Sequence, residues 1–209
     1  MNILIIDDHR IFSAGLEFLL DGISGDNNIT TEVSCEAALN NIRNMATPDL
    51  ILLDYNLPNS HGEQSLTVIK NAFPSAIVVI ISSEESHGII HNMIEGGAAG
   101  YIPKSSEPKL LEHALNLVLA GGVYLPPQAF DTLGRRIKVD ETKALTDRQE
   151  QVLKGAVAGK TNKVIANELN IAEGTVKSHL SSAYECMGVS NRTEAVLVAA
   201  KFGIGKQLY

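Results

Sequence analysis

The sequence predicts an α/β fold with a doubly wound, five-stranded parallel sheet, followed by a small all-α domain of four helices that contains a helix-turn-helix. Two observations support this prediction. Over roughly the first 121 residues, short apolar segments alternate with amphipathic ones, which is the pattern of repeated strand–helix–strand units. From residue 144 onward, only amphipathic segments with helix-type ends remain.

Two of the apolar segments end abruptly on carboxylates. Residues 2–6 lead into Asp7 and Asp8, and residues 50–53 lead into Asp54. A single Asp after a strand also starts turns or caps helices, so Asp54 alone indicates little. In a parallel sheet, however, the carboxyl ends of the strands share the edge where open α/β sheets bind their ligands. We therefore expect the three carboxylates to converge.

Three crowded carboxylates repel one another, so such a cluster normally holds a hard cation such as Mg²⁺. Magnesium beside a carboxylate nucleophile is typical of phosphoryl transfer, in which the nucleophile becomes an acyl phosphate. Asp54 is the candidate reacting group.

The remaining elements follow in order along the chain. Helices are expected at about 10–22, 34–45, 62–72, 84–95 and 106–120, and strands at 29–33, 76–81 and 100–103. The fourth strand then delivers Ser82, and the fifth delivers Lys104, to the acidic edge. A Ser there commonly caps the next helix, and a Lys there is commonly a solvated charge. Beside the carboxylates, Lys104 supplies a point charge and Ser82 a hydroxyl donor for phosphoryl oxygens.

Composition and apolar run lengths narrow the class of protein. The chain has 209 residues, of which 44% are hydrophobic, so it can bury a sizeable core. Its longest apolar runs, 76–81 among them, are too short to span a membrane, and no signal pattern opens the chain. We expect a soluble, cytoplasmic protein with no membrane partner. Cys35 and Cys186 lack metal-type spacing and are expected to be reduced and structural.

The net charge of −7 is unevenly distributed. Residues 144–209 hold eight Lys and Arg against six Asp and Glu, whereas nine basic and eighteen acidic residues precede them. The C-terminal segment is therefore the part suited to approach phosphate.

Residues 1 to about 121 resemble the receiver domain of two-component response regulators, which has a flavodoxin-like fold. The matching motifs, in chain order, are Asp7-Asp8, Asp54 followed by Leu57-Pro58 and Gly62, Ser82-Ser83, Gly100-Tyr101 and Lys104. The resemblance implies the strand order 2-1-3-4-5, which the family shares with other doubly wound sheets.

The same resemblance implies roles for individual residues. Asp54 would accept a phosphoryl group from a histidine of a sensor kinase. The implied Mg²⁺ site consists of Asp7, Asp8, Asp54 and the Asn56 carbonyl, with Asp7 completing the pocket. Lys104 and Ser82 would contact the phosphoryl oxygens. Tyr101 matches the family's switch aromatic; the alternative is a half-buried tyrosine of a strand.

The chain changes character over residues 122–143. Pro126-Pro127 comes first, followed by the charged residues Arg135-Arg136-Ile137-Lys138 and Asp140-Glu141. Proline and mixed charge indicate a linker. We therefore expect domains at 1–121 and 144–209.

The C-terminal domain begins with a capping box at Thr146 and Gln149. Further helices are expected at 162–169, from about 173 to 187, and from about 191 to 202, and a tight turn at 170–172 indicates a helix-turn-helix. In the third helix one stripe is apolar and faces the core: Val176, Leu180, Ala183 and Met187. The outward stripe is polar, which suits either an ordinary solvated face or a DNA major groove: Lys177, Ser178, Ser181 and Glu185.

This domain is similar to the LuxR-type DNA-binding domain. The similarity rests on Leu145-Thr146, Arg148-Gln149, Val152-Leu153, Gly159-Lys160-Thr161-Asn162-Lys163, Ile165-Ala166, Leu169, Thr175-Val176-Lys177-Ser178-His179-Leu180 and Asn191-Arg192-Thr193-Glu194-Ala195. It implies base or phosphate contacts by Thr175, Lys177, Ser178 and Ser181, with Lys160 and Lys163 near the DNA backbone.

The domain departs from this family pattern at Ser181 and near Glu185-Cys186, where the family often carries basic residues. Fewer cations release fewer counterions, so we expect low monomer affinity for DNA and dependence on dimerisation.

Together the motifs predict a phosphorylation-dependent transcription regulator of the NarL/LuxR type, and not an enzyme. Its expected partners are a sensor histidine kinase, double-stranded promoter DNA, RNA polymerase and a second copy of the chain. One alternative is a Mg²⁺-dependent phosphatase, but such enzymes usually carry a second Asp where this chain has Asn56. The other is a receiver joined to a protein-docking module, which Ser181 and Glu185 would suit.

Overall fold

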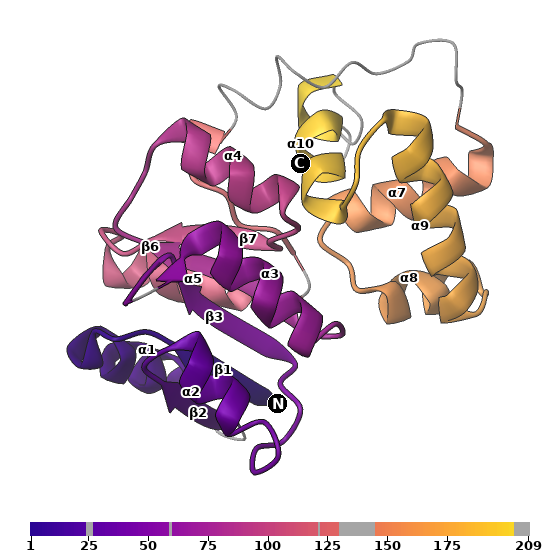
Figure 1. The fold of residues 1–209 in the computed structure, drawn as a ribbon. Helices are drawn as coiled ribbons and strands as arrows, with labels where there is room; N and C mark the ends of the chain where they lie inside the picture. Colours follow the sequence, from indigo (N-terminus) through magenta and orange to yellow (C-terminus); the bar gives the residue numbers. More distant parts are fainter. Residues whose placement is uncertain (24–26, 59, 121, 130–144, 203–209) are drawn as a thin grey trace.

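The computed structural model describes residues 1–23, 27–58, 60–120, 122–129 and 145–202. The described residues before 130 form a sheet domain, and those from 145 form a helical domain (Figure 1). The sheet has five parallel strands in the order β2-β1-β3-β6-β7. These strands are β1 (Asn2–Ile6), β2 (Asn28–Glu32), β3 (Leu50–Asp54), β6 (Ile77–Ser82) and β7 (Gly100–Pro103). The doubly wound sheet expected from the sequence is confirmed.

Helices cover both faces of the sheet. Alternate side chains of each central strand point to opposite faces, so Ile3 and Ile5 pack into one core and Leu4 and Ile6 into the other. The first core is closed by α1 (Arg10–Ile23) and α5 (Pro108–Leu119). The second is closed by α2 (Cys35–Asn40), α3 (Gly62–Ala72) and α4 (His87–Glu95). Burial on both faces explains why the strands are continuous apolar runs.

Three helices are shorter than the sequence predicts, and the one expected at 106–120 spans Pro108–Leu119. The helix expected at 84–95 begins only at His87, because the backbone of Glu84 is bonded to side chains of neighbouring strands. The helix expected at 34–45 ends at Asn40 and buries only Cys35 and Ala38, so little packing supports further turns. A short hairpin, β4 (Asn56–Leu57) and β5 (Ser60–His61), precedes α3 and was not predicted.

Part of the segment expected to be a linker packs on the sheet domain. The backbone N–H of Tyr101 donates to the carbonyl of Tyr124 at 2.9 Å. Ala129 is buried, and Leu125 packs against the same core. Residues 130–143 of the expected linker lie outside the described residues.

The helical domain consists of α7 (Asp147–Val157), α8 (Asn162–Leu169), α9 (Glu173–Met187) and α10 (Arg192–Phe202). Both arms of the predicted capping box are present, since the Thr146 hydroxyl accepts from the Gln149 N–H and the Gln149 side chain accepts from the Thr146 N–H. Between α8 and α9, Asn170 adopts the left-handed conformation at φ 52°. This residue type tolerates that conformation, which lets the chain turn sharply.

The two domains touch through α4 and α10, which lie side by side in Figure 1. The Asn191 side chain donates to the Ile94 carbonyl at 2.9 Å, and the Thr193 hydroxyl donates to the Ala98 carbonyl at 3.0 Å. Leu197 of α10 is buried in the core cluster that α4 also contributes to. Within the described part of the chain, no helix combines the length and the apolar composition needed to cross a bilayer.

Candidate functional site

The sheet topology brings the predicted charged residues to one edge. Asp7 directly follows β1, Asp54 ends β3 and Lys104 directly follows β7. Because β1, β3, β6 and β7 are adjacent and parallel, their carboxyl ends meet. The convergence expected from the sequence is therefore present in the structure.

Lys104 is paired with two buried carboxylates. Its Nζ lies 2.7 Å from Asp54 Oδ2 and 2.8 Å from Asp7 Oδ2, and the two aspartates are 1% and 2% exposed. Burial raises the pKa of the Asp7 carboxyl, and the hydrogen bond from Lys104 opposes that shift. The ring of Phe12 lies beneath the ammonium, with its centroid 4.9 Å from Nζ. The carboxylate that would react is thus held by a cation in a largely water-excluded place.

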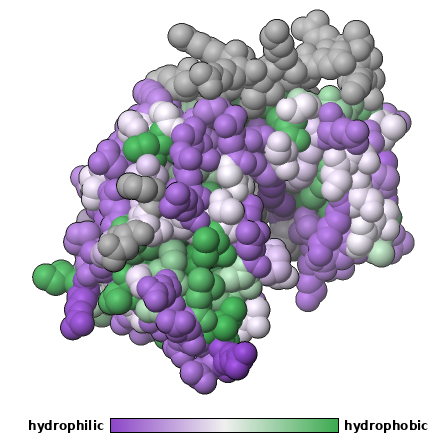
Figure 2. Space-filling model, viewed as in Figure 1, coloured by the Kyte–Doolittle hydropathy of each residue, from purple (hydrophilic) through white to green (hydrophobic). Residues whose placement is uncertain are grey.

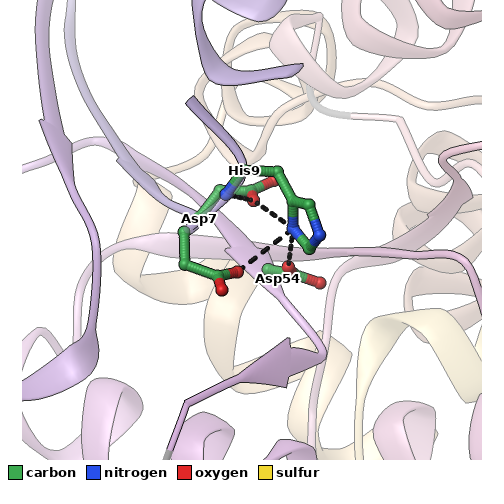
Figure 3. A group of neighbouring side chains, drawn as sticks. Asp7, His9 and Asp54 are labelled. Atoms are coloured by element: carbon green, nitrogen blue, oxygen red, sulfur yellow. Dashed lines mark hydrogen bonds and ion pairs between the residues drawn. The ribbon is translucent and has the colours of Figure 1, made fainter. Parts of the chain in front are cut away.

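His9 is a member of this site that the sequence analysis did not identify. Its Nδ1 lies 3.1 Å from Asp8 Oδ1, 3.3 Å from Asp7 Oδ1 and 3.6 Å from Asp54 Oδ2. Figure 3 shows the ring turned toward Asp7 and Asp54. The backbone N–H of His9 also donates to Asp7 Oδ1 at 2.8 Å. The sequence feature that could have identified His9 is its position directly after Asp7 and Asp8.

The donor set suits a hard divalent cation. Ligand atoms of Asp7, Asp8, His9 and Asp54 all lie within 4.8 Å of one another. Three of these residues offer carboxylate oxygen, the ligand type that Mg²⁺ prefers. Asn56 lies beside them, because its N–H donates to Asp54 Oδ1 at 3.0 Å. An open cleft next to Asp54 is lined by Asp8, Tyr55, Asn56, Leu57, Pro58, Ser60 and Gly62.

Ser82 and Tyr101 form a separate hydrogen-bonded group next to the carboxylates. The Ser82 hydroxyl accepts from the Glu84 N–H at 2.9 Å, and the Tyr101 hydroxyl donates to the Glu84 carbonyl at 2.5 Å. Both side chains are fully buried, and burial raises the pKa of Tyr101 to about 12. Tyr101 is therefore fully buried rather than half-buried in this structure, and its role as a switch residue stays a prediction.

The second candidate surface lies on α9. The predicted core stripe is buried: Val176, Leu180, Ala183 and Met187. The predicted outward residues are exposed: Lys177, Ser178, Ser181 and Glu185. Thr175, the other predicted DNA contact of this helix, is exposed as well. In the view of Figure 2, polar side chains prevail over the face of the helical domain. The candidate DNA-binding face of α9 is therefore open to solvent while α10 contacts the sheet domain.

The two flanking lysines differ in their surroundings. Lys163 is exposed at the start of α8. Lys160 is half-buried, and its Nζ lies 2.8 and 2.7 Å from the two carboxylate oxygens of Glu168. Lys160 would have to leave Glu168 to reach a phosphate.

An acidic, lysine-capped pocket on a doubly wound parallel sheet, joined to a four-helix domain with a helix-turn-helix, defines a phosphoacceptor-type signalling domain with a DNA-binding output. Family models agree with both halves. Residues 3–116 match the response regulator receiver domain, and residues 143–199 match the bacterial regulatory proteins of the luxR family. The chain belongs to the response regulators with a LuxR-family DNA-binding domain, and it is a transcriptional regulator.

Individual relatives extend over both domains. The chain is 37% identical over 208 residues to the glycerol metabolism activator of Pseudomonas putida, with 94% of each chain covered. It is 30% identical over 201 residues to the nitrate/nitrite response regulator protein NarL of Escherichia coli K12, with 93% of each covered.

Solved structures show the same fold. A LuxR family DNA-binding response regulator from Silicibacter pomeroyi is 36% identical with a TM-score of 0.54, covering 61% of this chain and 98% of that one. RcsB from Salmonella enterica serovar Typhimurium, solved bound to promoter rprA with the phosphomimetic BeF3−, is 24% identical with a TM-score of 0.57, covering 97% and 99%.

Proposed function

We propose that Asp54 accepts a phosphoryl group from a histidine of a sensor kinase, and that this modification controls binding of residues 144–209 to promoter DNA. The observation that supports this most is the pairing of Lys104 with both Asp54 and Asp7 at the buried sheet edge. Lys104 is held there by the two carboxylates, and its ammonium group could move from them to an oxygen of a phosphoryl group on Asp54. Asp54, with one oxygen on the Asn56 N–H, keeps a defined orientation for attack.

Mg²⁺ would be held by Asp7, Asp8, Asp54 and the Asn56 carbonyl. When bound, it supplies positive charge that neutralises the phosphoryl oxygens during transfer. Asp7 is shielded from water by burial, while Asp8 is partly exposed and borders the open cleft. Incoming cation and phosphodonor would enter through that cleft.

Ser82 connects the site to the rest of the domain. Its hydroxyl accepts one hydrogen bond from Glu84 and can donate another to a phosphoryl oxygen. Movement of Ser82 would change the position of Glu84, whose carbonyl holds Tyr101. Because Glu84 lies three residues before α4, this network would pass the change to the helix that contacts the output domain.

The DNA contacts would come from α9 and its neighbours. Thr175, Lys177, Ser178 and Ser181 are exposed and short or flexible enough to reach base edges or phosphates. Lys163, and Lys160 once released from Glu168, would meet the DNA backbone. A homodimer would place two recognition helices on half-sites about one helical turn apart. We place this function in the cytoplasm, with RNA polymerase as a further partner.

The test is selection of host genomic DNA fragments by the full-length protein, with and without acetyl phosphate and Mg²⁺. Asp54→Ala is the test variant, and Asp21→Ala, an exposed substitution on α1, is the matched control. We expect a two-fold symmetric site enriched only with donor and only when Asp54 is present. Equal enrichment in every sample would show that DNA binding does not depend on phosphorylation of Asp54. Enrichment in none, with a protein captured instead, would favour the docking module.

A further inference from the structure

Hydrogen bonds from the helical domain to the sheet domain hold the two domains together, and one of the donors is buried. Thr193, in the first turn of α10, is 2% exposed and donates to the carbonyl of Ala98, just beyond the end of α4. Asn191 caps the Ile94 carbonyl, one of the last in α4. Carbonyls at the end of one domain's helix thus receive donors from the other domain.

Titratable side chains from both domains lie at this contact. His91 and Glu95 come from α4, and Glu194 comes from α10. His91 is 6% exposed and Glu194 is 7% exposed, and His91 Nε2 lies 3.1 Å from Glu95 Oε1. Glu95 is 58% exposed at the edge of the contact, and its charge and that of His91 act on the buried carboxyl group of Glu194 from the other domain.

The local structural role of Glu194 does not require its charge. Its carboxylate accepts from the Ser190 N–H at 2.6 Å, while its own N–H donates to Asn191 Oδ1 at 2.9 Å. This arrangement resembles a capping box, in which glutamine serves as well as glutamate. Burial raises the pKa of the Glu194 carboxyl; the Ser190 N–H opposes the shift, Glu95 adds to it, and His91 opposes it.

The other charged groups around the contact have partners of their own. Arg192 of α10 donates to the carbonyls of Ala156 and Lys160 at the end of α7, with Tyr184 of α9 beside it. Lys70 of α3 donates to the carbonyls of Gly96 and Gly97. The cations of these neighbouring elements are thus directed at backbone oxygens rather than at Glu194.

We propose that the contact between α4 and α10 is proton-linked: protonation of Glu194 closes it, and ionisation of Glu194 loosens it. In the closed form an ionised Glu194 is buried near Glu95, whereas in the open form water solvates it. The direction of the pH effect follows because the pKa of Glu194 is higher in the closed form than in the open form. The closed form is favoured at pH below the ordinary value for glutamate, and that advantage is lost as pH rises through the raised value. The open-to-closed ratio rises by up to about tenfold per pH unit in this window.

Small-angle X-ray scattering of the full, unphosphorylated chain tests this inference, at constant ionic strength and pH from about 5 to about 8. Glu194→Gln is compared with the wild-type side chain, both alone and in a Thr193→Val background, which lacks the hydrogen bond to the Ala98 carbonyl and should favour the open form. We expect the radius of gyration to rise with pH when Glu194 is present and to stay at its low-pH value in Glu194→Gln. Glu95→Gln removes the like charge and should reduce the rise.

Two results would overturn the inference. One is the same pH course of the radius of gyration in the wild type and in the Glu194→Gln variant; the other is a radius independent of pH in both backgrounds. Circular dichroism at each pH verifies that every variant retains its helices, so that unfolding is not mistaken for domain opening.

Discussion

The non-polar side chain of Phe12 lies against the charged side chain of Lys104. Its ring is half-buried against the core of the sheet domain and lies 4.9 Å from Lys104 Nζ. The face of an aromatic ring attracts an ammonium group by about 0.5–2 kcal/mol. Phe12→Leu keeps the apolar contact and removes this attraction, so we expect the affinity for BeF3− in the presence of Mg²⁺ to fall roughly 2- to 30-fold.

The control for this prediction is Phe12→Tyr, which keeps the ring and should retain the affinity. Titration calorimetry with Mg²⁺ alone should differ less between the variants, because Phe12 acts on Lys104 and not on the carboxylates. Equal BeF3− affinity in Phe12→Leu and Phe12→Tyr would show that the ring face does not position Lys104.

At the residue scale, the sequence predicted the parts of the site that depend on strand ends. Asp7, Asp54 and Lys104 each terminate or follow an apolar run, and parallel topology alone makes them converge. His9 and Phe12 lie at the start of α1, and their role depends on the direction in which that helix leaves the sheet. Such a direction is set by packing of distant residues, so local pattern does not reveal it.

At the element scale, helix ends were predictable where local capping decides them. The limits of α3 and α8 agree with the sequence, and the Thr161 hydroxyl caps α8 through the Val164 N–H. The start of α4 was not predictable, because Glu84 is engaged by Ser82 and Tyr101 from two different strands. The hydrogen bond between Glu84 and Ser82 is local, but the one from Tyr101 is tertiary, and together they override a local helix pattern.

The capping box of α7 gives a prediction for the stability of the helical domain. Thr146→Ala removes the acceptor for the Gln149 N–H, so we expect the free energy of unfolding of this domain to fall by about 1 kcal/mol. Urea titration followed by amide resonances of α7 and α9 measures this domain separately from the sheet domain. Thr146→Ser keeps the hydroxyl and should retain most of the stability. An unchanged midpoint in Thr146→Ala would mean that the cap does not stabilise α7.

At the scale of the whole molecule, the sheet domain covers α10 and leaves α9 exposed. Thr193 and Leu197 of α10 are buried, whereas Lys177 and Ser181 of α9 are open to solvent. Control of DNA binding in this arrangement would therefore act through what α10 is free to contact, rather than by covering the candidate DNA-binding face of α9. A second copy of the chain would need an exposed surface to bind, and in the closed form the sheet domain covers the buried side of α10.

The hydroxyl of Thr193 offers a test of that arrangement in the intact protein. Thr193→Val is close in shape and leaves the buried Ala98 carbonyl without its donor, which costs about 1–3 kcal/mol. The open-to-closed ratio should rise roughly 5- to 160-fold. We expect Thr193→Val to retain the selected DNA site without a phosphate donor, in an electrophoretic mobility assay at fixed salt, while Thr193→Ser still requires the donor. If Thr193→Val depends on the donor and on Asp54 as the wild type does, the contact between α4 and α10 is not what restrains the output domain.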